Sequence, residues 1–155
     1  MHKEIRVVFN TSVFVPAVVK SLNPSFPDHE NEFIAYNKFL EKGHYLVISQ
    51  EIINEYCKVI AEEPFNFSPQ IILVSRMLDL TCLGKLRNAD TKLGSQIKVN
   101  VKIHNDDLHL LKAAIALDAD FIVTEDGKLL AAADEVSKKH GVRIINAKTY
   151  ATKYC

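Results

Sequence analysis

Residues 105–130 read NDDLHLLKAAIALDADFIVTEDGKLL, and the rest of the chain is organised around this stretch. Asp106 and Asp107 open an apolar helical pattern, where acids in the first turn complement the helix dipole. The β-type run FIVT follows at 121–124 and predicts a short buried strand. Asp126 comes just after that run. The stretch therefore places acids at the start of a helix and at the end of the next strand.

Length and composition predict one ordinary globular domain over residues 1–155. The 155 residues are 48% hydrophobic and 25% charged, and the formal net charge is zero. Binding to a polyanion would therefore require a local basic patch. The three cysteines are widely spaced without a CxxC pair, which argues against a disulfide framework and a zinc site. With no apolar signal segment and no long apolar run, we expect a cytoplasmic protein without membrane association.

The first unit of the chain is predicted to be strand, polar turn and helix. The run IRVVF at 5–9 has the composition of a strand buried on both faces. Asn10, Thr11 and Ser12 follow, and their side chains favour turns and helix N-caps. An apolar helical segment at 13–22 ends at an Asn-Pro pair, because a residue before proline avoids helical dihedrals.

The remaining periodicities continue this alternation. Helices are predicted at 27–42, from a cap at Ser49 to Pro64, from a cap at Ser68 to residue 80, at 128–137 and at the C-terminal end, with strands at 45–48, 97–103 and 142–145. Short apolar strands alternating with helices predict an α/β fold with a parallel sheet covered on both faces. Ligands bind such sheets at the carboxyl ends of the strands, so the positions after residues 9 and 123 should share one site.

Several classes of function are excluded by what the sequence lacks. The glycines do not form a dinucleotide fingerprint or a P-loop, and neither GxSxG nor HExxH occurs. These absences argue against a dehydrogenase, an NTPase, a serine hydrolase of that type and a zinc protease. His104 and His109 are interpreted as solvated residues at a helix end rather than as ligands.

The remaining candidates for chemistry are acids at element boundaries. They are Glu55, Asp106, Asp107 and Asp126, with the turn after the first strand nearby in the expected topology. Clustered carboxylates repel one another unless a hard cation lies between them, and Mg²⁺ or Mn²⁺ suits such a site. Those ions activate water and neutralise charge on a phosphodiester. Taken singly, each acid has an ordinary explanation as a first-turn acid, a turn residue or a solvated charge.

Taken together, four motifs resemble the PIN-domain family. The run VVFNTSVFV resembles its opening strand and turn, with Asn10 where the usual form has Asp. SQEIINEY resembles the second motif and makes Glu55 its acid. DDLHLLKAAIALDADFIVTEDGKLL resembles the third and fourth motifs and places family acids at Asp107 and Asp126. The resemblance covers nearly the whole chain in the right order.

This resemblance implies a Rossmann-like three-layer α/β/α fold with a central parallel sheet of four to five strands. It also implies metal-dependent cleavage of RNA, as in toxin–antitoxin ribonucleases, with Mg or Mn held by Glu55, Asp107 and Asp126. These three residues and Asn10 would be the catalytic set. A homodimer and an antitoxin or regulatory protein would be the protein partners. The implied substrate-binding residues are Thr11, Ser12, Thr124 and Lys128, the last of which replaces an acid frequent in the family.

Asn10 leaves the function open. A neutral amide lacks the charge that offsets dehydration of Mg²⁺, and it cannot act as a general base. The chain is then a PIN-type endoribonuclease with weakened metal binding, a catalytically silent RNA- or protein-binding relative, or an enzyme inactivated by an introduced change. A signalling domain that accepts phosphate is a further class, although no Asp ends the first strand. The basic segments 85–102 and 138–153 would flank the pocket and hold RNA, and helices at 30–42 and 68–80 could form a dimer interface.

Overall fold

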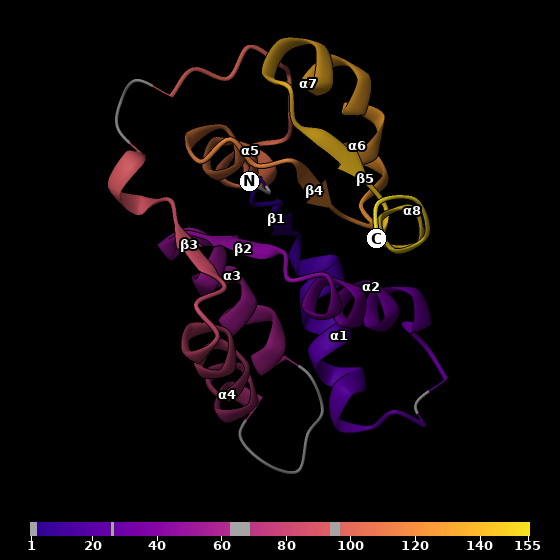
Figure 1. Cartoon of the computed structure of the whole chain (residues 1–155). Helices are drawn as coiled ribbons and strands as arrows, with labels where there is room; N and C mark the ends of the chain where they lie inside the picture. The colour runs from indigo at the N-terminus through magenta and orange to yellow at the C-terminus, as the bar shows by residue number, and fades with distance from the viewer. Residues whose placement is uncertain (1–2, 26, 63–68, 94–96) are drawn as a thin grey trace.

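The computed structural model describes residues 3–25, 27–62, 69–93 and 97–155. Within these residues, five parallel strands form one sheet in the order β3-β2-β1-β4-β5 (Figure 1). The strands are β1 (Arg6–Phe9), β2 (Tyr45–Ile48), β3 (Leu86–Asn88), β4 (Phe121–Val123) and β5 (Arg143–Ile145).

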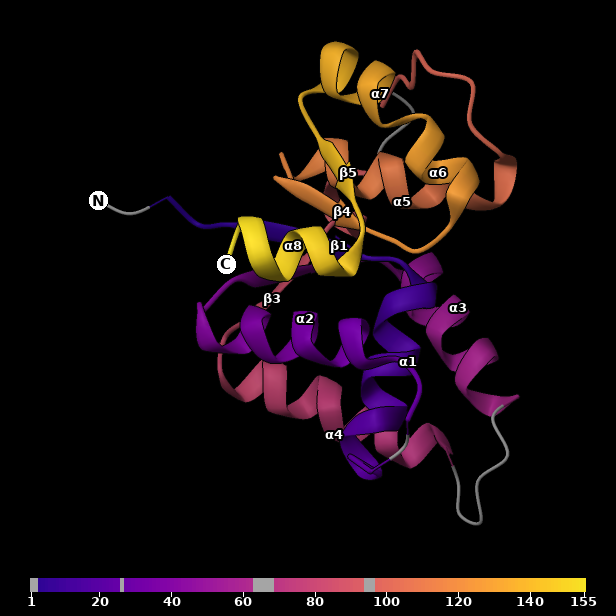
Figure 2. The ribbon, with the colours of Figure 1, turned by 90° about the vertical axis from the view of Figure 1, so that its right-hand side faces the viewer.

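Helices cover both faces of this sheet. Figures 1 and 2 show α1, α2 and α8 on one face and α5, α6 and α7 on the other, with α3 and α4 beside α1. The predicted three-layer α/β/α fold is thus confirmed. The helices are α1 (Thr11–Leu22), α2 (Glu30–Glu41), α3 (Gln50–Ala61), α4 (Pro69–Cys82), α5 (Asn105–Ala116), α6 (Gly127–Ala131), α7 (Ala133–His140) and α8 (Ala147–Lys153), with a 3₁₀ turn, η1, at Asp90–Lys92. Among the residues described, no helix is long and apolar enough to cross a membrane.

The strand order reverses between β1 and β4. The chain passes from β1 to β2 and β3 towards one edge, and then crosses to β4 and β5 on the other side. Phe9 is in register with Val123, so β1 and β4 end at the same level. A crevice at such a reversal is the usual ligand site of parallel sheets. The residues that follow Phe9 and Val123 lie at this edge, as the sequence predicts.

Polar side chains collect at the carboxyl ends of the strands because they cap the helices that follow. A cap residue accepts a backbone N–H that the first helical turn leaves unpaired. Ser49 does this for α3, as predicted. The other side chains that cap helices after strands are Asn10, Asp126 and Asn146. The same local chemistry that starts these helices therefore lines the ligand-binding edge with oxygen and nitrogen atoms.

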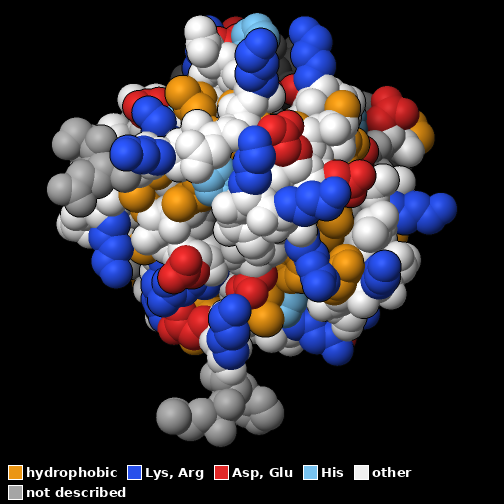
Figure 3. Space-filling view, turned by 90° about the horizontal axis from the view of Figure 1, so that it is seen from above, with side chains coloured by type: hydrophobic (Ala, Val, Ile, Leu, Met, Phe, Trp, Pro, Cys, Tyr) orange, Lys and Arg blue, Asp and Glu red, His pale blue; other side chains and the backbone are white. Residues whose placement is uncertain are grey.

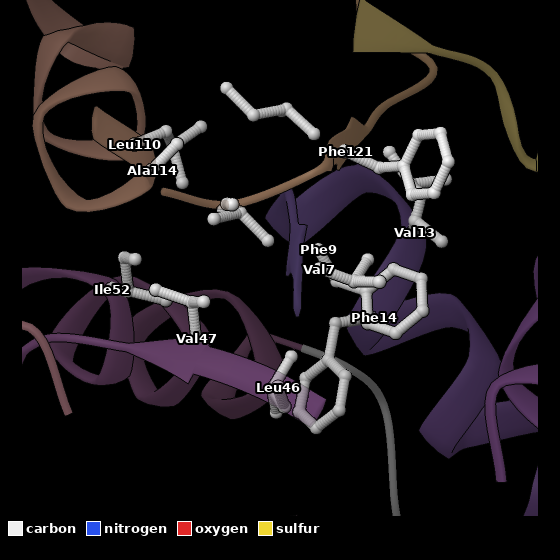
Figure 4. Close-up of a cluster of buried hydrophobic side chains, with 14 of the residues drawn as sticks. Val7, Phe9, Val13, Phe14, Leu46, Val47, Ile52, Leu110, Ala114 and Phe121 are labelled. Carbon is white, nitrogen blue, oxygen red and sulfur yellow. The ribbon is translucent and has the colours of Figure 1, made fainter. Parts of the chain in front are cut away.

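The core explains why the strands have no alternating polar face. Val7, Val8 and Phe9 are completely buried, and so are Ile122 and Val123 in the neighbouring strand. Figure 4 shows side chains of β1, β2 and β4 meeting those of α1, α3 and α5. Helices cover both faces of the sheet, so these buried positions of the two strands are all apolar.

The predicted strand at 97–103 is wrong. These residues belong to no strand, and the edge strand β3 forms earlier, at Leu86–Asn88. The alternation of the sequence reflects burial alone, because Val101 is buried while Lys98 and Lys102 are exposed. An extended segment can lay alternate side chains on a core without a neighbouring strand to pair with.

Two smaller differences concern helices. The helix predicted at 128–137 is divided into α6 and α7, which meet at Ala132. The helix predicted from residue 27 begins at Glu30. The predicted helix end at Pro64 and cap at Ser68 lie outside the described residues.

His44 gives the fold a pH dependence that can be measured. It is only 8% exposed, and its Nδ1 lies 2.6 Å from the Tyr150 hydroxyl of α8. Burial holds the pKa of His44 below its usual value of 6.5. The unfolded chain therefore binds this proton more readily than the folded chain. We expect the free energy of unfolding to decrease as the pH falls from about 6.5 towards the lowered pKa, which urea unfolding between pH 7.5 and 5 measures.

Two variants separate this titration from the hydrogen bond. His44→Phe removes the titrating group and should flatten its part of the pH dependence, while the unpaired Tyr150 hydroxyl costs about 1–3 kcal/mol. Tyr150→Phe keeps the histidine buried and should keep the pH dependence. The same slope in His44→Phe as in the parent would show that other groups cause it.

Candidate active site

A pocket of about 510 Å³ opens at the carboxyl edge of the sheet, where β1 and β4 end. Its walls come from the first turns of α1 and α5, the middle of α3 and the residue that caps α6. The lining residues are Asn10, Thr11, Ser12, Val15, Pro16, Glu55, Val59, Asp106, Asp107 and Asp126. The fold thus brings the acids and the polar turn chosen from the sequence into one pocket.

Glu55 reaches the pocket from α3 and is paired with His109 of α5. Glu55 Oε2 and His109 Nε2 lie 2.8 Å apart. The two atoms are not aligned for a hydrogen bond, so both remain buried without a hydrogen-bond partner in the described chain. The contact with His109 nevertheless holds the pKa of Glu55 below its usual value, against the effect of burial. Glu55 is therefore ionised, with Oε2 held against His109.

The interpretation of His109 as a solvated helix-end residue is wrong. Its side chain is only 14% exposed, because α5 packs against α3 at this point. Burial disfavours its charged form, but contact with Glu55 outweighs burial and raises the pKa of His109 above its usual value. The available sequence signal was its helical spacing, since His109 lies three residues after Asp106 and therefore on the same side of the helix. His104 is half exposed, as expected, and its ring caps α5.

Asp107 and Asp126 also line the pocket. Burial raises the pKa of Asp107, and the charges of Asp126 and Glu55 raise it further. Asp126 also caps α6, with its Oδ1 accepting the N–H of Lys128 at 2.9 Å. Negative potential from two neighbouring carboxylates thus acts on Asp107. A bound cation would relieve this repulsion.

Asn10 lies almost completely buried at the base of the pocket, with 6% exposed. Its Oδ1 accepts the N–H of Thr11 at 2.8 Å and so caps α1. Its Nδ2 donates to Ser12 Oγ at 3.2 Å and to Thr124 Oγ1 at 2.7 Å. The carbonyl oxygen that Asn10 could offer to a metal is therefore already engaged by the helix cap.

The implied substrate-binding residues divide into two groups. Thr11 and Ser12 line the pocket, and the buried Thr11 hydroxyl has no hydrogen-bond partner among the described residues. Thr124 is completely buried behind the pocket and accepts the N–H of Asp126 at 3.0 Å, which shapes the strand end. Lys128 is exposed on α6 and does not line the pocket.

The pocket suits a hard divalent cation in its chemistry, although it is not a closed cage. Carboxylate oxygens are the ligands that Mg²⁺ and Mn²⁺ prefer. Glu55, Asp107 and Asp126 each bring carboxylate oxygens to the lining of the pocket. No three Asp, Glu, His or Cys side chains among those residues stand close enough to form a ready metal cluster. A cation held here would keep several water molecules, as Mg²⁺ commonly does.

A second pocket extends this site along α3. It has a volume of about 640 Å³ and shares Glu55, Val59 and Asp106 with the first. Lys58 and Asn54 are among its other lining residues. The two pockets therefore adjoin each other along α3.

Comparisons with known proteins agree with this architecture. The family profile of the PIN domain matches residues 6–128, and the chain therefore belongs to the PIN-domain family, a family of nucleases.

One solved structure with the same fold is the crystal structure of VapBC2 from Rickettsia felis bound to a DNA fragment from their promoter. The alignment has 19% sequence identity and a TM-score of 0.57, and it covers 92% of this chain and 98% of that chain. At this identity the likeness supports the fold alone. No curated protein matches the chain significantly.

Proposed function

We propose that the chain is an endoribonuclease of the PIN type that depends on Mg or Mn. The observation that carries this proposal is the gathering of Glu55, Asp107 and Asp126 around one pocket at the edge where the paired strands β1 and β4 end. Burial is the main cause of the raised pKa of Asp107, and the charges of Asp126 and Glu55 add to it, which agrees with such a gathering. Membership of a nuclease family supports the same reaction class.

On this proposal, Glu55, Asp107 and Asp126 hold the ion. When bound, such an ion lowers the pKa of water and offsets the charge that develops on a phosphodiester. The chain itself contributes positioning. His109 keeps Glu55 ionised by lowering its pKa. Asn10 fixes Ser12 and Thr124 at the end of the sheet.

The alternative is a silent PIN-fold domain that binds RNA or a protein. It is favoured by Asn10, whose oxygen caps α1 and whose neutral amide adds no negative charge to the site. Incubation of a mixed single-stranded RNA with the chain and Mn²⁺ separates the two. A nuclease gives cleavage that EDTA abolishes. Normal metal binding without cleavage of any RNA would overturn the nuclease proposal.

The proposal includes a protein partner, either an antitoxin or a second copy of the chain. An exposed apolar stripe on α4 supports it, with Ile71, Val74 and Leu78 at 67%, 55% and 57% exposure. These residues lie on one face of the helix, and Leu83 extends the stripe beyond its end. An exposed apolar surface of this kind is typical of a site that binds an apolar helix of a partner.

The two basic segments meet in a way that suits an RNA backbone. Lys139 Nζ of α7 donates to the carbonyl of Asn100 at 2.8 Å, and the N–H of Asn100 donates to His140 Nε2 at 3.2 Å. Lys98 and Lys102 project from the same segment, which leads directly into the first turn of α5. Figure 3 views this side of the molecule, where Lys and Arg side chains are spread over the surface with some acids between them. We propose that an RNA strand follows this basic segment to the pocket.

Replacing both exposed lysines tests that path. We expect Lys98→Ala/Lys102→Ala to weaken single-stranded RNA binding and to reduce the slope of log K against log salt by about 1.4, since each phosphate contact contributes about 0.7. Fluorescence titrations from low to moderate salt measure this slope. The matched control is Lys38→Ala/Lys42→Ala at the end of α2, on the other face of the sheet. Equal slopes in both double variants would contradict the path.

A further inference from the structure

We propose that the Ser12 hydroxyl donates a hydrogen bond to a phosphate oxygen of the substrate, and that Asn10 is the residue that frees this donor. The inference rests on the proposed function only in taking an RNA phosphodiester as the ligand. It gives Asn10 a positive role, as a positioning residue, where its neutrality otherwise only weakens metal binding.

The argument begins with the lone pairs of two hydroxyl oxygens. Ser12 Oγ accepts from Asn10 Nδ2 at 3.2 Å and from the N–H of Glu125 at 3.0 Å. Thr124 Oγ1 accepts from Asn10 Nδ2 at 2.7 Å and from the N–H of Asp126 at 3.0 Å. A hydroxyl has two acceptor positions and one proton to donate. Both oxygens are therefore fully used as acceptors, and both protons remain to be placed.

The orientation of the amide follows from the helix cap. Asn10 Oδ1 accepts the N–H of Thr11, so Nδ2 must face the two hydroxyls. If the amide were reversed, its NH₂ group would face the N–H of Thr11. Donors would then oppose each other, and that backbone N–H would lose its cap. The geometry of α1 therefore requires Asn10 to act as a donor towards Ser12 and Thr124.

Burial decides which of the two protons faces the pocket. Ser12 Oγ and Thr124 Oγ1 lie 3.4 Å apart, so one hydroxyl can donate weakly to the other. Thr124 is completely buried, whereas Ser12 is partly exposed and lines the pocket. An unpaired proton costs less where water or a ligand reaches it. Ser12 Oγ already accepts two hydrogen bonds, so the proton of the buried Thr124 makes only a long, weak contact with it, and the proton of Ser12 faces the pocket.

An aspartate at position 10 would reverse this polarity. A carboxylate only accepts hydrogen bonds, so it would draw the protons of both hydroxyls towards itself. Ser12 would then present an oxygen lone pair to the pocket rather than a proton. The first turn of α1 contains no acid, so its positive end also favours an anion beside Ser12. The asparagine thus exchanges negative charge for a donor that suits a phosphate oxygen.

A double-mutant cycle between positions 10 and 12 tests the inference. The four proteins are the parent, Ser12→Ala, Asn10→Asp and the double variant, and the probe is a labelled single-stranded RNA of mixed sequence. Binding is measured with Ca²⁺, which fills hard oxygen sites, and the thermal midpoint of each protein is recorded. We expect Ser12→Ala to weaken binding about tenfold in the parent. In the Asn10→Asp background the same change should alter binding less than about twofold, because Ser12 no longer donates to the ligand.

The outcomes are decisive in both directions. Ser12→Thr keeps a hydroxyl at the same position and should bind RNA within about twofold of the parent. Equal losses in both backgrounds would mean that Ser12 is only structural, and no loss in the parent, or no RNA binding by it, would also overturn the inference. Cleavage with Mn²⁺ is scored separately. Coupled binding without cleavage would leave the donor role standing and overturn the nuclease proposal.

Discussion

The Asp126→Asn variant is expected to lose about 100-fold or more of the Mn²⁺-dependent RNA cleavage of the parent chain. A metal-bound carboxylate contributes to stabilisation worth several kcal/mol, and about 1.4 kcal/mol corresponds to tenfold in rate. Asparagine caps a helix as well as aspartate does, so it should still accept the N–H of Lys128. The fold should therefore survive, and initial rates over a Mn²⁺ series measure the loss at the site.

Asn10→Asp changes the charge of the pocket in the opposite direction from Asp126→Asn. It adds a charge beside the acids that line the pocket, so we expect tighter Mn²⁺ binding and about tenfold faster cleavage when Mn²⁺ is limiting. Asp134→Asn, on α7 and outside the pocket, is the matched control and should leave both properties unchanged. If Asn10→Asp cleaves RNA and the parent does not, the parent is the silent relative. If Asp126→Asn cleaves as fast as an active parent, Asp126 is not a ligand.

The sequence was sufficient for the parts of the fold that local chemistry determines. The run at 5–9 is apolar at every position except Arg6, which predicts a strand covered on both faces, and Val7, Val8 and Phe9 of β1 are buried in that way. Asn10 and Ser49 have cap chemistry, and each caps the helix that follows it. The rule that ligands bind parallel sheets where the strand order reverses then predicted that β1 and β4 end at one site. This rule depends on the topology of the sheet and not on individual contacts, and β1 and β4 do end in register.

The parts that the sequence could not supply depend on contacts between distant elements. Glu55 and His109 meet because α3 and α5 pack together, and neither helix pattern contains that information. The alternation at 97–103 shows which side chains face inward, but a strand also needs a free neighbouring edge. At position 10, the residue type alone shows that the usual negative charge is missing. The orientation of the Asn10 amide, in contrast, follows from its hydrogen bonds to Thr11 and Thr124.

Phe14→Ala is the stability change with the largest expected effect, a loss of about 3–5 kcal/mol in the free energy of unfolding. Phe14 is completely buried. Its ring stacks on Tyr56 with centroids 4.4 Å apart and meets Tyr36 edge-on at 5.9 Å. Figure 4 shows it beside Phe9 in the core. Truncation would open a cavity among rigid rings that cannot collapse into it, and urea unfolding measures the cost.

The same variant should also weaken the site, because Phe14 joins the helices that carry it. Phe14 lies one turn after the polar start of α1, and its partner Tyr56 follows Glu55 in α3. The Tyr56 hydroxyl also donates to the carbonyl of Phe9, at the end of β1. Leu83→Ala removes an apolar side chain that is 63% exposed and should change stability by less than about 0.5 kcal/mol. A loss below about 1.5 kcal/mol in Phe14→Ala would mean that the surrounding rings rearrange, and metal affinity measured on the folded variant would then remain close to that of the parent.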